Sequence, residues 1–210
     1  MSHDEIAENN LFHAKIKNVE SAQNPEIWNF EQNYSGPSGD FAQYLHPLQD
    51  NLEEAVIRRI TYRKGSIGVL FSGGLDCSLV AYFTLSYFHR NLPNEKLYLF
   101  SVAFGKTEND FELCPDRKTA ISSYEELRNL FPDLKIELIK IDVYKPELDE
   151  MRKSRIRDLL SPRISVLDDS IGCALWFASH SDKAPDCRLL LSGLGADELF
   201  CGYSCHRIGF

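Results

Sequence analysis

Two glycine-rich segments contain residue types and spacings that could bind a phosphate. The first, residues 72–78, has the sequence SGGLDCS, and its candidate ligands are Ser72, Gly73, Gly74, Asp76 and Ser78. Glycines let the backbone approach a ligand closely, and free N–H groups at the start of a helix attract an anion. Because Asp76 would repel a phosphate unless a cation lay between them, the segment predicts Mg²⁺ bridging carboxylate and phosphate oxygens. Ser72 and Ser78 supply hydroxyl donors for the same anion.

A tight strand-to-helix turn with a serine or aspartate cap is the alternative interpretation of residues 72–78, since it explains most Gly-Gly turns. The combination of Ser, Gly, Gly, Asp and Ser between a strand and a helix favours the phosphate site. Two other nucleotide-binding patterns are absent from the sequence. It has no GxxxxGK[ST], and residues 193–196, GLGA, lack the remaining spacing of GxGxxG.

Alternating strand and helix patterns must position these segments. Apolar residues that recur every three or four positions predict helices, and short apolar runs predict buried strands. The predicted helices are residues 41–62, 76–89, 115–131, 146–160 and 166–179, and the predicted strands are residues 67–71, 97–104, 135–143 and 188–191. This alternation predicts an α/β fold, a doubly wound parallel sheet with helices on both faces. The first glycine-rich segment directly follows the strand at 67–71, and the second, which starts at Ser192, directly follows the strand at 188–191. We therefore expect both segments to share the sheet edge where such folds bind ligands.

Length and composition narrow the class of protein. The 210 residues, 43% hydrophobic and 26% charged, suit one globular domain with a tail. Residues 1–40 are polar and predict a linker or domain edge, and residues 41–210 predict the folded domain. The net charge of -8 argues against a broad nucleic-acid surface. No apolar run approaches the ~18 residues of a membrane helix and residues 1–10 do not resemble a signal peptide, so we expect a cytoplasmic protein without a membrane partner.

The cysteines show no paired CxxC spacing. They stand at positions 77, 114, 173, 187, 201 and 205. This scatter is typical of reduced thiols in a reducing compartment. A metal site at Cys201, Cys205 and His206 is the alternative, but the sequence offers no second ligand pair, and a small buried thiol is the commoner role.

Three segments resemble one known family. Residues 72–78 resemble the SGGxDS loop of the N-type ATP pyrophosphatases, the PP-loop enzymes with an adenine nucleotide alpha hydrolase-like fold, which cleave ATP between its α- and β-phosphates. Residues 191–203, LSGLGADELFCGY, resemble the SGxGADELFGGY signature of asparagine synthetases and β-lactam synthetase. Residues 115–120, PDRKTA, resemble the PDxxxA start of a helix in the same enzymes. The resemblance covers residues 41–210 and is closest to a eukaryotic branch of the asparagine synthetase family, judged by residues 166–178 and 202–204.

The resemblance implies an ATP-dependent amide ligase of asparagine biosynthesis. An aspartate carboxylate would be activated as an acyl-adenylate, with release of pyrophosphate, and then amidated by ammonia. Asp76 and Asp197 would be catalytic and would hold Mg²⁺ and pyrophosphate. Adenine would lie against Leu70, Val102, Ser192 and Gly193. Glu198 would either support the metal or cap a short helix, and Asp168, Asp169 and Ser170 are further candidates for a substrate pocket.

Four departures from the family pattern favour a second hypothesis, a catalytically inactive ATP-binding or partner-binding module. Residue 2 is serine where the glutaminase nucleophile would be cysteine, so ammonia is expected from a glutaminase domain outside this chain. Leu194 stands where the family has its proposed general base, and an apolar side chain takes no proton. Cys77 replaces a serine, and the C-terminal helices that deliver a lysine are expected to be missing after Phe210. A tRNA-thiolating enzyme is a third hypothesis, which the negative net charge and the cysteine spacing disfavour.

Overall fold

The computed structural model describes residues 42–61, 64–162 and 165–203, without the side chains of residues 42–45. The chain divides into two compact units, Met1–Leu52 and Glu53–Phe210. Helix α3, Ala42–Ile60, supplies the described part of the first unit and continues into the second. The predicted linker at residues 1–40 lies outside the described residues.

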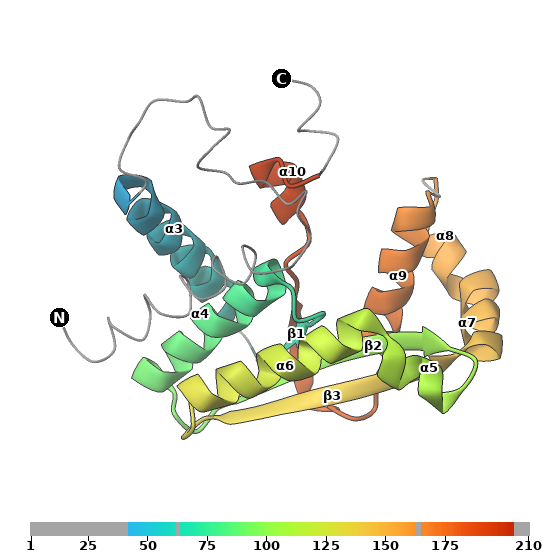
Figure 1. Cartoon of the computed structure of the whole chain (residues 1–210), viewed down its shortest axis with the longest axis horizontal. Helices are drawn as coiled ribbons and strands as arrows, with labels where there is room; N and C mark the ends of the chain where they lie inside the picture. Colours follow the sequence, from blue (N-terminus) through green and yellow to red (C-terminus); the bar gives the residue numbers. More distant parts are fainter. Residues whose placement is uncertain (1–41, 62–63, 163–164, 204–210) are drawn as a thin grey trace. The chain divides into compact units, whose positions relative to one another are not determined.

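Within the described residues, four parallel strands form one sheet (Figure 1). They are β1, Ser66–Leu70; β2, Lys96–Gly105; β3, Lys135–Tyr144; and β4, Cys187–Leu191. Their spatial order is β3-β2-β1-β4. Ile67 and Val69 of the central strand β1 are fully buried, as expected for a short apolar run covered on both faces.

Helices connect the strands as the apolar periodicity predicts. Outside α3 they are α4, Leu75–Asn91; α5, Glu108–Leu113; α6, Pro115–Leu130; α7, Lys145–Met151; α8, Arg157–Leu160; α9, Val166–Ser179; and α10, Ala196–Phe200. A π-helical segment, Arg152–Ile156, joins α7 to α8, so the helix predicted at 146–160 is continuous but not uniformly α-helical. The sequence predicted no helix between β2 and α6, but a capping box at Thr107 and Asp110 starts α5 there.

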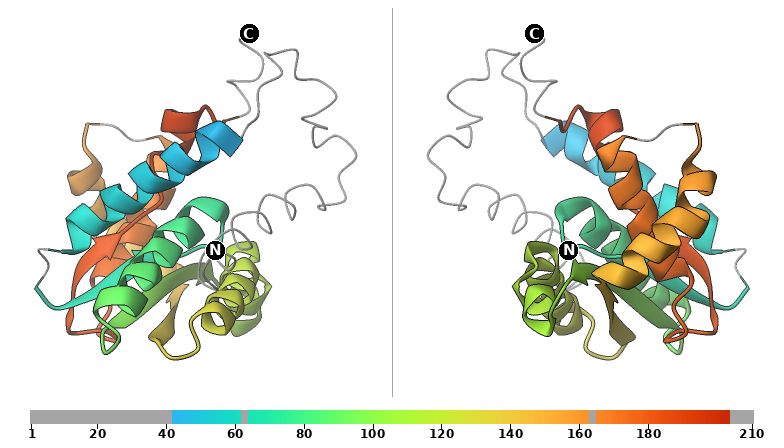
Figure 2. Two further views of the ribbon diagram at one scale, coloured as in Figure 1. Left: turned by 90° about the vertical axis from the view of Figure 1, so that its left-hand side faces the viewer. Right: turned by 90° about the vertical axis from the view of Figure 1, so that its right-hand side faces the viewer.

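The sheet carries an apolar layer on each face, which confirms the doubly wound α/β prediction. Successive strand residues point to opposite faces, so Leu99 and Phe100 enter different layers. The layer on the Phe100 side includes Ile141 of β3 and Phe177 of α9. Figure 2 shows α4 and α6 on one side of the sheet and α7 to α9 on the other.

Strand order places a ligand site at one position. The chain runs outward from β1 to β2 and β3, and then returns to lay β4 on the other side of β1. The crossover that leaves β1 leads to β2 on one side, whereas the connection from β3 arrives at β4 on the other side, which makes the crevice at the carboxyl ends of β1 and β4 a topological switch point. Ligands of open parallel sheets bind in such a crevice.

Asp186, just before β4, forms hydrogen bonds to β1 and β2 at the opposite end of the sheet. Its carboxylate accepts hydrogen bonds from Ser66 Oγ at 2.5 Å and from Tyr98 Oη at 2.8 Å. These bonds, led by that from Ser66, lower the pKa of Asp186 below its ordinary value.

Asp186→Asn is expected to destabilise the domain near neutral pH and to have little effect in acid. An aspartate whose pKa is lower in the folded state adds stability above its unfolded pKa of about 3.9, and this stability is lost as pH falls through the folded pKa. Urea unfolding of both proteins between pH 7 and pH 3 measures the difference. A gap between the two midpoints that stays constant over this range would contradict the role of the charged carboxylate.

Candidate functional site

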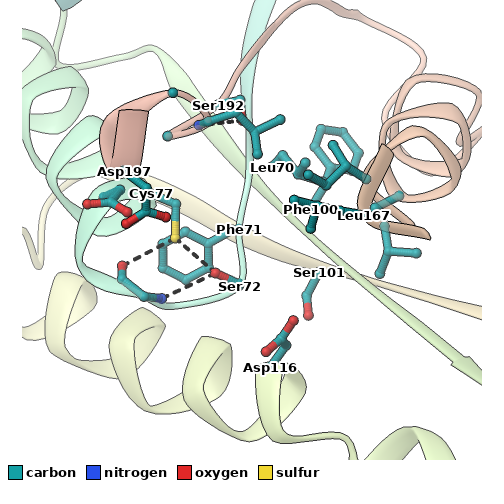
Figure 3. Close-up of a pocket in the computed structure, with 18 of the residues that line it drawn as sticks. Leu70, Phe71, Ser72, Cys77, Phe100, Ser101, Asp116, Leu167, Ser192 and Asp197 are labelled. Carbon is teal, nitrogen blue, oxygen red and sulfur yellow. Dashed lines mark hydrogen bonds between the residues drawn. The ribbon is translucent and has the colours of Figure 1, made fainter. Parts of the chain in front are cut away.

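The two glycine-rich loops touch at the carboxyl ends of β1 and β4, as their positions after predicted strands led us to expect. A Cβ atom added to Gly193 would lie 2.8 Å from both Cβ of Asp76 and the backbone N of Cys77. Any side chain at residue 193 would therefore push the second loop away from the first. Asp76, at the start of α4, and Asp197, at the start of α10, both line one cavity, which Figure 3 shows with Asp197 and Cys77 labelled.

A cavity of about 390 Å³ opens between these loops, within the usual size range of ligand pockets. Most of the predicted site residues line it, and they are Leu70, Ser72, Gly74, Asp76, Val102, Ser192, Gly193 and Asp197. Gly73 and Ser78 do not line it. The Gly73 carbonyl accepts hydrogen bonds from Ser78 Oγ at 3.3 Å and from Ser123 Oγ at 2.9 Å. Ser78 therefore holds the first loop from behind, while Ser72 reaches the cavity.

Gly73 fixes the first loop against α6. It has a φ of +81°, and an added Cβ would lie 2.4 Å from the backbone C and O atoms of Thr119. Gly195 in the second loop also has a positive φ, of +94°, but an added Cβ would meet no atom within 4 Å. The two glycines thus share a left-handed conformation and differ in the space around them.

Gly73→Ala is expected to lower the free energy of unfolding by about 2 to 5 kcal/mol, since it adds overpacking to the strain of a left-handed residue. Gly195→Ala, the matched control, adds the strain alone and is expected to cost about 1 to 2 kcal/mol. Denaturant unfolding of both variants measures the two losses. Equal losses would show that the close approach to α6 is unimportant for stability.

Asp76 and Asp197 form the electrostatic centre of the cavity. Burial, and after it the charge of Asp197, raises the pKa of Asp76 above its ordinary value. A cation held between the two carboxylates would remove that repulsion, because each charge would gain an opposite neighbour. Gly202 limits the position of Asp197, since an added Cβ would lie 2.0 Å from Asp197 Oδ1.

The described residues fit a metal site that a ligand completes. No group of three or more His, Cys, Asp or Glu side chains in the described part of the chain is arranged to hold a metal ion. Mg²⁺ is usually held by one or two carboxylates together with substrate phosphates and water, so the pair Asp76 and Asp197 is sufficient for it. Of the alternative metal set, Cys201 is an exposed free thiol, and Cys205 and His206 lie outside the described residues.

Three further residues whose roles the sequence left open contribute differently to the cavity. Glu198 lines it and accepts a hydrogen bond from Tyr203 Oη at 2.6 Å. Leu194 also lines it, with 51% of its surface exposed. The Cys77 thiol stays within the first loop, donating to the Gly74 carbonyl at 3.3 Å. An apolar side chain therefore faces the ligand space at residue 194.

The acidic start of α9 is mainly structural. Asp168 lines the cavity, but its carboxylate closes a capping box with Ser165. Asp169 forms an ion pair with Arg152, with Nε to Oδ2 at 2.9 Å, and neither Asp169 nor Ser170 lines the cavity. The more distant α9 residues Cys173 and Phe177 are buried in the core.

Sequence reasoning gave no role to several residues that line the cavity. They are Phe71, Phe100, Ser101, Asp116, Leu167, Ile171, Ala174, Gly195 and Tyr203. The α9 members stand at three- and four-residue spacing, which is a signal for one helix face but not for what that face covers. Asp116 belongs to the PDxxxA segment, which was the one available signal for its position.

A parallel α/β sheet with two motif loops in contact at its switch point defines a domain of the PP-loop type. The family model described as asparagine synthase matches residues 47–209. The chain therefore belongs to the asparagine synthase family, which uses ATP, and the resemblance found in the sequence is confirmed.

Relatives include asparagine synthetase domain-containing proteins of several eukaryotes. One from Drosophila melanogaster is 42% identical over 151 residues, covering 69% of this chain and 26% of the relative. Asparagine synthetase domain-containing protein 1 of Homo sapiens is 31% identical, covering 78% and 32%. One from Saccharomyces cerevisiae is 34% identical, covering 74% and 33%. The chain thus spans about a quarter to a third of the length of these relatives. No helix among the described residues is long and apolar enough to cross a membrane.

Proposed function

We propose that this domain binds ATP with Mg²⁺ in the cavity between its two loops and activates aspartate for amidation. The observation that carries the proposal is the contact of Gly193 with Asp76 and Cys77, because it joins the two loops whose aspartates would share the metal. The carboxylate of aspartate would attack the α-phosphorus of ATP, and the bond to pyrophosphate would break. Ammonia would then attack the acyl carbon, and AMP would leave with its bonding electron pair.

Each part of the cavity has a task in this reaction. The N–H groups of the first loop and the Ser72 hydroxyl would bind phosphate oxygens, as glycine-rich loops before helices do. Asp76 and Asp197 would hold Mg²⁺, which neutralises phosphate charge when bound. Leu70 and Val102 would contact the adenine ring, with Ser192 and Gly193 beside it.

The surroundings of the reaction are also proposals. Ammonia would come from solution or from a glutaminase domain. The thiols of Cys77, Cys114, Cys173, Cys187 and Cys201 are free. Free thiols fit a reducing compartment such as the cytoplasm.

Leu194 favours a second candidate, a module that binds ATP without turning it over. The amidation step releases protons, and a residue lining the cavity at this position would be the natural acceptor. A leucine accepts none, so the base must come from elsewhere or the step must be slow. Nucleotide binding does not need that proton transfer and would be retained.

Formation of AMP from ATP, Mg²⁺, aspartate and ammonia tests the proposal, with calorimetric titration of ATP beside it. AMP that depends on aspartate supports the ligase. ATP binding without AMP supports the binding module. If ATP does not bind at all in the presence of Mg²⁺, both candidates are wrong.

A further inference from the structure

The peptide bond between Gly73 and Gly74 is held by side chains that lie outside the cavity. Gly73 is buried and does not line the cavity, whereas Gly74 is exposed and lines it. The Gly73 carbonyl accepts hydrogen bonds from the hydroxyls of Ser78 in α4 and Ser123 in α6. Two elements that flank the first loop therefore fix the direction of this carbonyl.

The direction of the Gly73 carbonyl determines where the Gly74 N–H points. Both groups belong to one planar trans peptide, in which C=O and N–H point in opposite directions. Because the carbonyl faces the two hydroxyls behind the loop, the N–H faces the other way, toward Ser72 Oγ at 3.3 Å. Ser72 lines the cavity, and Figure 3 shows it beside Cys77. The held peptide thus presents its donor on the cavity side of the loop.

Ser123 belongs to the buried face of α6. The buried residues of this helix are Arg117, Ala120, Ser123 and Leu127. Ser123 is 3% exposed, and its hydroxyl reaches, at 2.9 Å, the carbonyl of a residue 50 positions earlier in the chain. A buried hydroxyl costs free energy unless it is paired, which favours keeping this bond. Ser123 therefore joins α6 to the first loop.

Arg117 anchors the first turn of α6 to two strands. The residue is fully buried, and its Nη2 donates to the carbonyls of Ser101 and Ile141, each at 3.1 Å, and to Asp142 Oδ1 at 2.7 Å. Its Nε and Nη1 have no hydrogen-bond partner among the described residues, so burying this guanidinium costs stability. What its directional bonds supply is a defined position of α6 on β2 and β3, and hence of Ser123 behind the loop.

We propose that Ser123 is a positioning residue for phosphate binding, which holds the Gly73–Gly74 peptide so that the Gly74 N–H donates to a phosphate oxygen. This inference rests on the proposed function, which places the phosphates of ATP at the first loop. The bond from Gly74 N to Ser72 Oγ is long for an N–H donor, so a phosphate oxygen can replace it. A flipped peptide would turn the Gly73 carbonyl toward the phosphate, and two acceptors would then face each other. Holding the donor in place before binding avoids the cost of ordering it.

A purely structural role for Ser123 makes a different prediction. If the hydroxyl only joined α6 to the loop, its removal would lower the melting temperature and the fraction of protein that is able to bind. The affinity of the remaining folded protein would be unchanged. Calorimetry separates the two roles, because the stoichiometry reports the competent fraction and the dissociation constant reports the affinity.

Calorimetric titration of the full chain with Mg²⁺ and ATP, and with Mg²⁺ and inorganic pyrophosphate, tests the proposal. Ser123→Ala is expected to weaken both ligands by a similar factor, roughly 3- to 30-fold. This is part of what one hydrogen bond to a charged group supplies, since Ser78 still holds the carbonyl. Ser122→Ala, the same change at the exposed neighbouring position of α6, is the control and is expected to keep the wild-type affinities.

The amide resonance of Gly74 gives a second measurement. In the wild-type chain labelled with ¹⁵N-glycine, this resonance is expected to move when Mg²⁺ and pyrophosphate are added, because its N–H then donates to an anion. At saturation it is expected to move less in Ser123→Ala. Gly65, just before β1 at the opposite end of the sheet, is the reference and is expected to stay in place.

The outcomes separate this inference from the proposed function. If ATP does not bind to wild type, both are overturned. If ATP binds but Ser123→Ala keeps both affinities within about twofold, lowers the stoichiometry alone, or loses no more affinity than Ser122→Ala, only the inference is overturned. Should Ser123→Ala fail to fold, the wild-type spectrum decides. A Gly74 resonance that moves with bound pyrophosphate supports the inference, and one that stays in place contradicts it.

Discussion

Asp76→Asn is expected to weaken Mg²⁺-dependent ATP binding by at least about 10- to 100-fold, and to leave the unliganded domain as stable as wild type or more so. Removing even a supporting group of a metal site costs that much affinity, and Asp76 is proposed to contact the metal directly. The stability effect has the opposite sign, because the pKa of Asp76 is raised. The folded state then binds the proton more tightly than the unfolded chain, so stability falls as pH rises through the window between the two pKa values. A neutral asparagine avoids this loss at pH 7.

Two titrations and one unfolding experiment check this pair of effects. ATP affinity is measured with and without Mg²⁺ in wild type, Asp76→Asn and Asp182→Asn, the last being an exposed aspartate outside the cavity. Binding to wild type is also expected to weaken as pH falls through the raised pKa of Asp76, at a higher pH than an ordinary aspartate would give. If Asp76→Asn reduced stability and affinity together, misfolding would explain both and the metal role would be unsupported. Asp197→Asn should reproduce the loss of affinity.

Leu194→Glu is expected to increase the rate of aspartate- and ammonia-dependent AMP formation by on the order of 10² to 10⁴, the usual contribution of a positioned general base. Leu194 lines the cavity and is half exposed, so a longer polar side chain needs no space in the core. The substitution adds a proton acceptor on the second loop, beside the proposed reaction centre. It should affect the rate far more than ATP affinity, because the base acts on the amidation step.

Leu194→Gln is the matched control, with nearly the same shape and no basic group. Quenched-flow or coupled assays of AMP release compare the three proteins at fixed Mg²⁺ and ATP. A gain confined to the glutamate variant supports a ligase site that lacks its base. Equal rates for glutamate and glutamine would falsify the idea that proton transfer at this position limits turnover.

Much of the fold was predictable because its signals are local. The buried run of β1 and the periodic apolar residues of α9 give strand and helix directly, and α9 has the predicted bounds. Helix α5 was missed because its sequence is short and polar, and what starts it is the capping box of Thr107 and Asp110. A helix begun by a cap and only six residues long leaves little apolar periodicity to detect.

The candidate site was predictable to the extent that its loops follow strands. Chain order alone placed residues 72–78 and 192–198 at one edge, and Gly193 against Asp76 confirms that placement. The directions of individual side chains were harder to predict from the sequence. Ser78 faces the Gly73 carbonyl instead of the cavity, and Ser101 lines the cavity while its hydroxyl is buried. Such directions depend on packing between elements that are distant in the chain.

The pairing of β4 with β1 also bears on how the protein acquires its site. These strands are neighbours in space, but the chain completes β2 and β3 before it reaches β4. Contacts between distant segments form slowly, since a long loop must close before they are gained. Asp197 comes close to Asp76 only after this closure, so partly folded forms without docked β4 lack the complete site that we propose for the nucleotide. A ligand that binds the native form alone shifts the equilibrium toward it by mass action, so the proposed binding of ATP would protect the domain from proteolysis during refolding.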